Sequence, residues 1–370
     1  MLCEKRCKRR QDKPKRPFGE SGNALVVAGF AHSQTIARID TSGSDGRHHS
    51  VMESKVLSLV SLTTDEGPSS IQPWGPRSPH EAQGRSIAFH SAAEKGRTMP
   101  APNTISVEKL VRLIGTPKCP MLIDVRSEAD FEADPLLIPS SVRRASTQLD
   151  DWAEKYGGQS AVVICQTGLN ISQGAAAWLR HHGVSAEALE GGFEAWRQAG
   201  FSLVPHAKLP PADPRGRTVW VTRARPKIDR IACPWLIRRF VDPHALFLFV
   251  APSEVVAVAA RFAGVPFDIE NVFWSHRGDT CTFDTMVEEF GLGTAPLLRL
   301  ATIVRGADTA RPVLSPEAPG LLAASLGLSR MYADDLEQLE AGMLLYDAFY
   351  RWCRDATDET HNWPTNKPRA

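Results

Sequence analysis

No apolar run in the 370-residue sequence approaches the roughly 18 residues that a membrane-spanning helix needs, so no membrane span is expected. An excess of charge of one sign is also missing, because 43 basic and 42 acidic side chains leave a formal net charge of +1. This balance excludes a globally basic nucleic-acid-binding protein and an acidic tail protein. The seven cysteines form no repeated Cys-x-x-Cys pair, which argues against a disulfide framework and against a zinc ribbon. We therefore expect a cytoplasmic protein in a reducing compartment.

Residues 1–98 lack the pattern of a folded core. They contain one tryptophan, Trp74, and no tyrosine, and eight of the first 16 residues are lysine or arginine. Such a segment buries too little apolar surface to offset the entropy of the chain. We expect residues 1–98 to be a disordered or non-native N-terminal extension, with Met99 as an alternative start. A secretory signal is disfavoured because the apolar run at 24–31 has only eight residues.

Residues 103–204 alternate between short apolar runs and helical patterns. Strands that alternate with helices are typical of a small parallel α/β sheet. The patterns predict strands at 121–125, 161–164 and 184–189 and helices at 107–114, 149–156 and 172–182, with a further helix after Gly191-Gly192.

Cys165 follows the predicted strand 161–164 and precedes a loop that leads into the next helix. Ligands of open α/β sheets bind at the carboxyl ends of the strands. The N–H groups of the loop and the N-terminus of the helix place positive potential at the sulfur, which favours the nucleophilic thiolate. Cys165 is therefore the candidate nucleophile, the alternative being a buried structural cysteine.

The motifs of this segment resemble a single rhodanese domain. They comprise Leu-Ile-Asp-Val-Arg at 122–126, Val-Ile-Cys at 163–165, Ser-Gln at 172–173 and Leu-Glu-Gly-Gly-Phe-Glu-Ala-Trp at 189–196. The resemblance implies a sulfurtransferase that carries a persulfide on Cys165, with Asp124 and Arg126 as a supporting polar pair. The same pair can have a purely structural role. The cradle around the sulfur would be formed by Gln166, Thr167, Gly168, Leu169, Asn170 and Ile171.

The active-site loop departs from the family pattern in length. Ser172 comes one residue later than in many sulfurtransferase rhodaneses, and seven-residue loops are typical of rhodanese-like phosphatases. Those phosphatases close the loop with an arginine, whereas Asn170 and Ile171 stand here, so an oxyanion would lack its main charge partner. Three interpretations remain open: sulfur transfer with a small thiol or sulfur donor and acceptor, binding of an oxyanion or metalloid, and an inactive scaffold.

The proline-rich segment 205–217 predicts a semi-rigid linker, and residues 218–364 predict a second, mostly helical α+β domain. Two strands are expected in this domain, at 218–222 and 246–250. Helices are expected at 229–240, 253–262, 282–290, 296–305, 316–326 and 333–354.

Polar side chains of the second domain interrupt its apolar helices and strands. Histidine, cysteine and carboxylates are ligands of transition metals, and arginines can hold a dianion. We therefore expect one site for a metal ion or an oxyanion, although capping and ion pairing can explain each residue singly. The metal ion is the one candidate cofactor. The candidates are Asp229, Arg230, Glu270, His276, Cys281, Asp284, Arg305 and Asp308.

The second domain resembles the C-terminal domain of the chromate-resistance protein family ChrB. The resemblance rests on the segments 225–240, 267–269, 275–276, 281–284, 303–308, 325–330 and 345–350. It implies thiol chemistry or sulfur transfer through Cys165 linked to oxyanion stress, with chromate or another oxyanion as a partner. The alternative is a regulatory protein that senses chromate or a metal and contains a non-catalytic rhodanese module. The N-terminal region usual in the family is not recognisable, so binding to DNA is not expected.

Overall fold

The computed structural model describes residues 103–359, and the predicted extension 1–98 lies outside this range. Within the described range, no helix combines the length and the apolar character that crossing a bilayer requires.

Residues 104–205 form a five-stranded sheet in which every pairing is parallel, in the order β1-β6-β5-β2-β4. The strands are β1 (Thr104–Ile105), β2 (Met121–Asp124), β4 (Ser141–Arg143), β5 (Ser160–Ile164) and β6 (Ser185–Leu189). A short antiparallel pair joins β3 (Leu136–Leu137) to β7 (Val204–Pro205).

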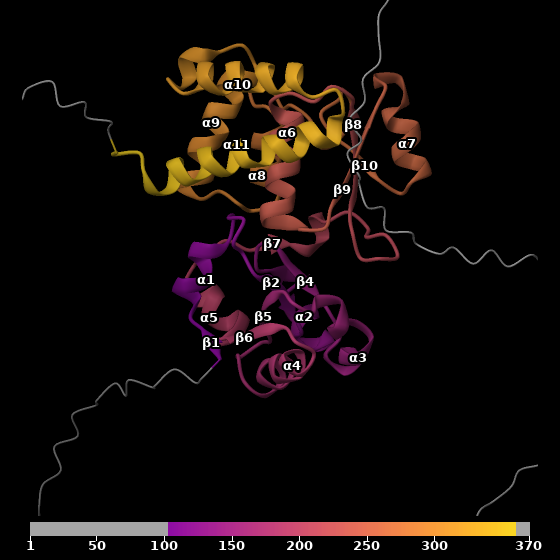
Figure 1. Cartoon of the computed structure of the whole chain (residues 1–370), viewed down its shortest axis with the longest axis vertical. Coiled ribbons are helices and arrows are strands. Elements are labelled where there is room, and N and C mark those ends of the chain that lie inside the picture. The colour runs from indigo at the N-terminus through magenta and orange to yellow at the C-terminus, as the bar shows by residue number, and fades with distance from the viewer. Residues whose placement is uncertain (1–102, 360–370) are drawn as a thin grey trace, which may run out of the picture. The chain divides into compact units, whose positions relative to one another are not determined.

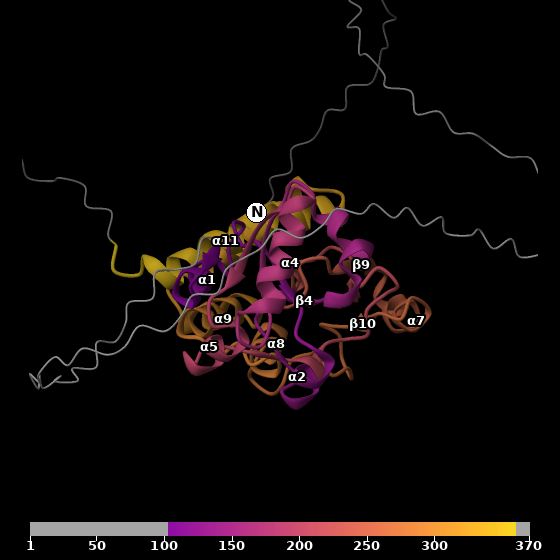
Figure 2. The same ribbon diagram turned by 90° about the horizontal axis from the view of Figure 1, so that it is seen from below.

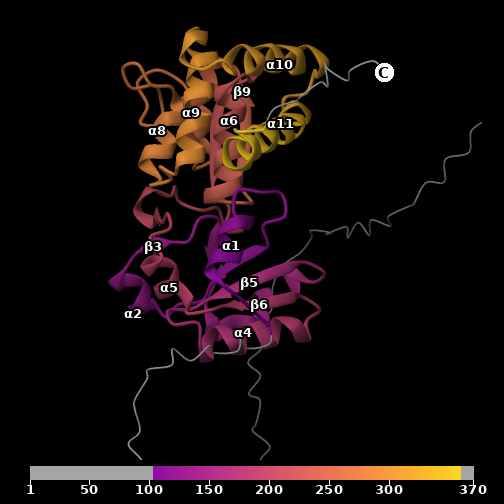
Figure 3. The ribbon, with the colours of Figure 1, turned by 90° about the vertical axis from the view of Figure 1, so that its left-hand side faces the viewer.

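Helices cover both faces of this sheet (Figure 3). Alternate residues of β2 and β5 point to opposite faces. Leu122 and Val162 join a core cluster that includes residues of α1 and α5, whereas Ile123 and Val163 join a cluster with residues of α3 and α4. Burial on both faces explains why these strands read as continuous apolar runs. The helices are α1 (Val107–Leu113), α2 (Glu128–Ala133), α3 (Leu149–Trp152), α4 (Asn170–His181) and α5 (Gly192–Gln198), with 3₁₀ turns at 146–148, 153–156 and 206–208.

Residues 219–266 contribute a three-stranded parallel sheet in the order β10-β8-β9. Its strands are β8 (Val219–Arg223), β9 (Leu246–Val250) and β10 (Val265–Pro266), and helix α7 (Val255–Arg261) packs on it through Val255 and Ala259. The sequence predicted β8 and β9 but not β10, because a two-residue strand shows no periodicity.

The remaining helices make up most of the second domain (Figures 1 and 2). Helix α9 contacts α8, α10 and α11. These helices are α6 (Asp229–Leu236), α8 (Thr282–Glu289), α9 (Ala295–Asp308), α10 (Ala318–Met331) and α11 (Asp335–Asp355), with 3₁₀ turns at 252–254 and 312–314. The predicted helix 229–240 divides into α6 and a π-helical turn, Ile237–Val241, just after Pro234 removes one backbone donor.

A buried carboxylate links α6, the π-helical turn and α11. Asp347 on α11 accepts hydrogen bonds from the Trp235 indole Nε1 at 2.8 Å and from the Arg239 guanidinium Nε and Nη2, both at 2.8 Å. The Trp235 indole is buried and the Arg239 side chain is 21% exposed, so replacing Asp347 by an apolar residue would leave a buried indole N–H without its partner.

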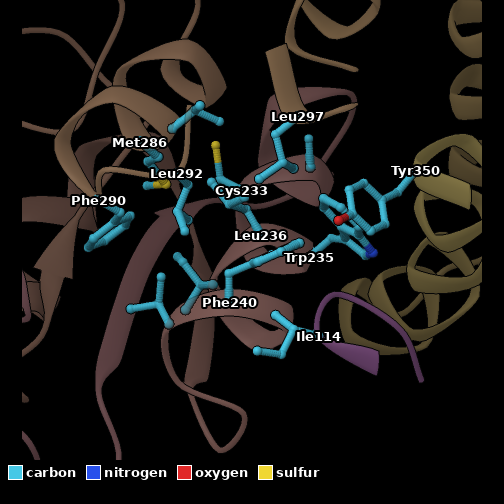
Figure 4. Packing of buried hydrophobic residues seen from close by; sticks show 14 of the residues in the cluster. Ile114, Cys233, Trp235, Leu236, Phe240, Met286, Phe290, Leu292, Leu297 and Tyr350 are labelled. Atoms are coloured by element: carbon cyan, nitrogen blue, oxygen red, sulfur yellow. The ribbon is translucent and has the colours of Figure 1, made fainter. Parts of the chain in front are cut away.

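One apolar cluster includes residues of both domains (Figure 4). Ile114, which follows α1, belongs to it together with Phe240 and Tyr350 of the second domain. A Cβ atom added at the neighbouring Gly115 would lie within 3.0 Å of both aromatic rings, and its φ of 76° also favours glycine. The Ser140 N–H donates to the Phe240 carbonyl at 2.6 Å. The two domains therefore share part of their core.

Candidate functional site

The structure places Cys165 directly after β5, at the carboxyl end of the sheet. The side chain is recessed, with 2% of the residue exposed. Its thiol donates to the Ser172 hydroxyl oxygen at an Sγ–Oγ distance of 3.1 Å, and that hydroxyl donates to the Leu169 carbonyl at 3.2 Å. The sulfur thus lies at the base of a loop whose far end is anchored by Ser172.

The loop after Cys165 is fixed against the N-terminus of α5. The Cys165 carbonyl accepts from the Phe193 N–H at 2.9 Å, and the Gln166 carbonyl accepts from the Glu194 N–H at 3.0 Å. Gly168 and Gly192 have φ values of 72° and 61°, and a Cβ atom on either would lie within 3.0 Å of backbone atoms. Two glycines are therefore needed for the loop and the helix to approach this closely.

The loop that follows Cys165 contains free backbone donors. Within residues 103–359, the N–H groups of residues 166–169 donate no hydrogen bond, and α4 begins at Asn170 without a side-chain cap. No side chain of the loop 166–171 carries a charge. An anion bound here would be stabilised by N–H groups and by the start of a helix.

A second group of polar residues converges on His276 in the helical domain. The His276 Nε2 atom lies 3.3 Å from Asp308 Oδ2, 3.4 Å from Asp268 Oδ1 and 3.6 Å from Asp229 Oδ2. Asp229 begins α6 and Asp308 ends α9, so the fold joins helix termini that are far apart in the sequence. We call Asp229, Asp268, His276 and Asp308 the carboxylate–histidine cluster.

The charges of the cluster shift the pKa values of its members. Burial, followed by repulsion from Asp308 and Asp268, raises the pKa of Asp229 well above its usual value. Hydrogen bonds to Asp268 and then Asp308 raise the pKa of His276 to about 10. Burial opposes ionisation of Asp268, but hydrogen bonds from His276 and Thr282 leave its pKa lowered. A protonated His276 is therefore the favoured form while no other cation is bound.

The buried Asp229 carboxylate is only half satisfied. Its Oδ2 accepts from the Thr282 N–H at 2.6 Å and from the Phe283 N–H at 3.4 Å, at the start of α8. Its Oδ1 is buried and has no hydrogen-bond partner among the described residues. Ile228, which precedes Asp229, has a φ of 40°, an unusual value for a β-branched residue.

Each of the two domains matches a known family model. Residues 220–353 match the family model of the ChrB C-terminal domain, and residues 106–199 match that of the rhodanese-like domain. Residues 106–199 are thus similar to a rhodanese-like domain, and residues 220–353 are similar to the ChrB C-terminal domain.

Three known proteins illustrate the similarity. Protein ChrB of Cupriavidus metallidurans is 34% identical over 154 residues, which are 40% of this chain and 45% of that protein, so the match spans less than half of the relative. A rhodanese-related protein from Thermoplasma volcanium is 23% identical, covering 28% of this chain and 97% of its own, with a TM-score of 0.25. A thiosulfate sulfurtransferase from Pseudomonas aeruginosa is 24% identical, and the match covers 30% of this chain and 21% of that protein, also with a TM-score of 0.25.

In the rhodanese-like domain, Asp124 and Arg126 form a buried ion pair at 2.7 Å. The Arg126 guanidinium also donates to the carbonyls of Asp134 at 3.1 Å and Leu136 at 2.6 Å, and it lies 3.8 Å from the centroid of the Phe193 ring. These contacts fix the chain after β2 and the start of α5. Through Phe193, whose N–H binds the Cys165 carbonyl, the pair positions the Cys165 loop from a distance.

In the second domain, the predicted site residues separate into groups. Asp229, His276 and Asp308 come together, and Arg230 joins them through an ion pair with Asp268 at 3.3 Å. Glu270 is exposed and lies outside the cluster.

Cys281, Asp284 and Arg305 form an adjoining network. Asp284 accepts from the Cys281 thiol at 3.1 Å and from the Arg305 guanidinium at 2.6 Å. Burial, and then the charges of Asp229 and Asp284, raise the pKa of the Cys281 thiol strongly, so it stays protonated.

The sequence reasoning missed Asp268 as a site residue. It lies two residues after the end of β10 and has a φ of 54°, and its neighbours Phe267 and Ile269 are apolar. An acid between two apolar residues in a recognised motif was the signal that could have found it.

Proposed function

We propose that the rhodanese-like domain transfers sulfane sulfur through a persulfide on Cys165. The observation that supports this proposal is the position of its Sγ, at the end of β5 beside Ser172 and a loop with free N–H groups. A persulfide is an anion at neutral pH, and neutral donors in a recessed site stabilise it without a bound metal.

The reaction has two balanced steps. The Cys165 thiolate attacks the outer sulfur of a donor such as thiosulfate, the S–S bond of the donor breaks, and sulfite leaves with the electron pair. The acceptor nucleophile, for instance cyanide, then attacks the outer sulfur of the persulfide. The Cys165–sulfur bond breaks, thiocyanate leaves and the Cys165 thiolate is restored, so the cycle needs no external oxidant or reductant.

The Ser172 hydroxyl can form a hydrogen bond with Cys165 as a thiol and as a thiolate. Its hydroxyl accepts from the thiol and donates to the Leu169 carbonyl. When Cys165 is ionised, rotation of this hydroxyl allows it to donate to the sulfur instead, because a hydroxyl is both donor and acceptor.

The neutral loop favours sulfur transfer over hydrolysis of a phosphate ester. A phosphoryl group develops charge on several oxygens, and enzymes meet that charge with arginine or a metal ion. The residues 166–171 offer neither an arginine nor a lysine. We propose that the transferase acts during stress by chromate or a related oxyanion, because residues 220–353 are similar to the ChrB C-terminal domain. The expectation that it acts in the cytoplasm depends on the cysteine pattern of the sequence.

The proposal is tested by cyanide-dependent formation of thiocyanate from thiosulfate with the full chain. Wild type is expected to turn over, and mass spectrometry is expected to find one added sulfur atom on the peptide with Cys165. Cys165→Ser is expected to abolish both signals. Cys119→Ser is the matched control, because Cys119 is a free cysteine of the same domain outside the loop. Turnover by Cys165→Ser, or no sulfur on wild-type Cys165 after exposure to thiosulfate, would overturn the proposal.

A further inference from the structure

We propose that Asp229, His276 and Asp308 of the ChrB C-terminal domain bind one divalent transition-metal cation of the Mn(II) or Zn(II) class. This site is separate from Cys165 and does not depend on sulfur transfer.

The geometry of the cluster is that of a ligand set. One ligating atom from each of the three residues lies within 4.8 Å of the other two. Metal–ligand bonds of about 2.0–2.2 Å place neighbouring ligands of a tetrahedral ion about 3.3–3.6 Å apart. The His276 Nε2 atom lies 3.3 Å from Asp308 Oδ2 and 3.6 Å from Asp229 Oδ2. A single N–H cannot point at both oxygens, whereas a cation between them can bind all three atoms.

The charges around the cluster select a cation over an anion. Arg223 and Arg230 pair with Asp268 at 3.1 and 3.3 Å, and Arg305 pairs with Asp284 at 2.6 Å. For Asp308, the one ion pair found among residues 103–359 is with His276. Asp229 and Asp308 with a neutral imidazole carry two negative charges, which one divalent ion neutralises. The three arginines already form ion pairs with Asp268 and Asp284, so an oxyanion in the cluster would be repelled by carboxylates whose charge is not neutralised.

The buried Asp229 carboxylate has one oxygen, Oδ1, without a hydrogen-bond partner among the described residues, which is a second observation at the cluster. Asp229 is 0% exposed, and its carboxylate faces His276 through Oδ2 while Oδ1 has no partner among the described residues. A buried acceptor without a partner costs about 1–3 kcal/mol, and more when it is charged. A bound cation would compensate for the burial of this carboxylate.

The mixture of ligands narrows the class of metal. Carboxylates suit Mg(II), Ca(II) and Mn(II), whereas imidazole suits Zn(II), Fe(II), Ni(II) and Cu(II). Two carboxylates with one imidazole favour ions that accept both, such as Mn(II) and Zn(II). The side chain of His276 is 42% exposed and that of Asp308 is 19% exposed, so solvent can reach the site and supply further ligands. Asp268 would act from outside the ligand set, because Thr282 and two arginines already engage its oxygens.

The test is calorimetric titration of the chelator-treated full chain with MnCl₂ and with ZnCl₂. Wild type is expected to bind one equivalent of at least one of them, and for Mn(II) the signal of the free ion in electron paramagnetic resonance should fall in step. Asp308→Asn and His276→Ala are expected to weaken binding by about 100-fold or more, since loss of an outer partner alone costs about 10–100-fold. Both side chains are partly exposed, so we expect these variants to fold, which circular dichroism checks.

Glu270→Gln is the matched control, because it removes an exposed carboxylate that lies two positions after Asp268 in the sequence and outside the cluster. It should bind as wild type does. Wild type that binds neither ion would overturn the proposal and leave protonated His276 as the charge that balances the acids. Folded Asp308→Asn and His276→Ala that both bind with wild-type affinity would overturn it as well.

Discussion

Replacing Gly192 by alanine tests how tightly the Cys165 loop is held. Gly192 begins α5 with a φ of 61°, and an added Cβ atom would lie 2.8 Å from the Gln166 carbonyl oxygen and closer still to the Cys165 carbonyl. All the atoms it meets belong to the backbone, so no side chain can turn aside. The loop and the helix would have to separate.

The size of the effect follows from two costs. A residue other than glycine in the left-handed region costs about 1–2 kcal/mol. Forcing apart packed groups costs about 1–3 kcal/mol. The sum of about 2–5 kcal/mol corresponds to a fall in Tm of about 4–20 °C for a chain of this size. Because the Cys165 loop must move, formation of thiocyanate should fall as well.

Gly174→Ala is the matched control for this substitution. Gly174 lies inside α4, and an added Cβ atom would meet nothing within 4 Å. Alanine should stabilise this helix by about 0.5–1 kcal/mol. Both variants restrict the unfolded chain in the same way, so the difference between their Tm values reports the folded loop. If Gly192→Ala melts at the temperature of Gly174→Ala, the close approach described here is wrong.

Three further substitutions test other contacts. Ser172→Ala should slow alkylation of Cys165 by iodoacetamide at neutral pH, because the thiolate loses a hydrogen-bond donor. An unchanged rate would show that the Ser172 hydroxyl does not stabilise the thiolate. Arg126→Met removes the closest partner of the buried Asp124, with Arg143 remaining 4.0 Å away, and should lower the free energy of unfolding in urea by about 3–5 kcal/mol; a loss below about 1 kcal/mol, typical of an exposed ion pair, would contradict this. Asp347→Ala should lower the free energy of unfolding by a similar amount. A Tm within about 1 °C of wild type would refute the stabilising role of the Asp347 hydrogen bonds.

The elements around Cys165 could be predicted because each carries a local signal. Buried strands appear as apolar runs, and glycines mark the ends of helices. The start of α4 was predicted at Ser172 but lies at Asn170, because Leu169 at the N-cap offers no capping side chain. Sequence patterns locate helix starts through such caps, so an uncapped start is placed too late.

The composition of the carboxylate–histidine cluster could be predicted only in part. Asp229, His276 and Asp308 stood out as polar residues in apolar surroundings, and the structure joins them. Glu270 shared that signal yet is exposed, because the direction of a side chain in a loop depends on tertiary packing. Asp268 was overlooked because its role depends on Arg223 and on other partners distant in the sequence.

The core around Ile114, Gly115, Phe240 and Tyr350 limits whether the two domains of this chain can be separated or exchanged. Domains that each have their own complete hydrophobic core can be exchanged between proteins, because each stays folded when the linker is cut. If the two halves of this chain were separated within 205–217, the aromatic rings of the second domain would face water. The apolar residue that follows α1 in the first domain would be exposed as well. We therefore expect the two halves to be stable only together, and a side chain at Gly115 would meet rings from more than 100 residues further along the chain.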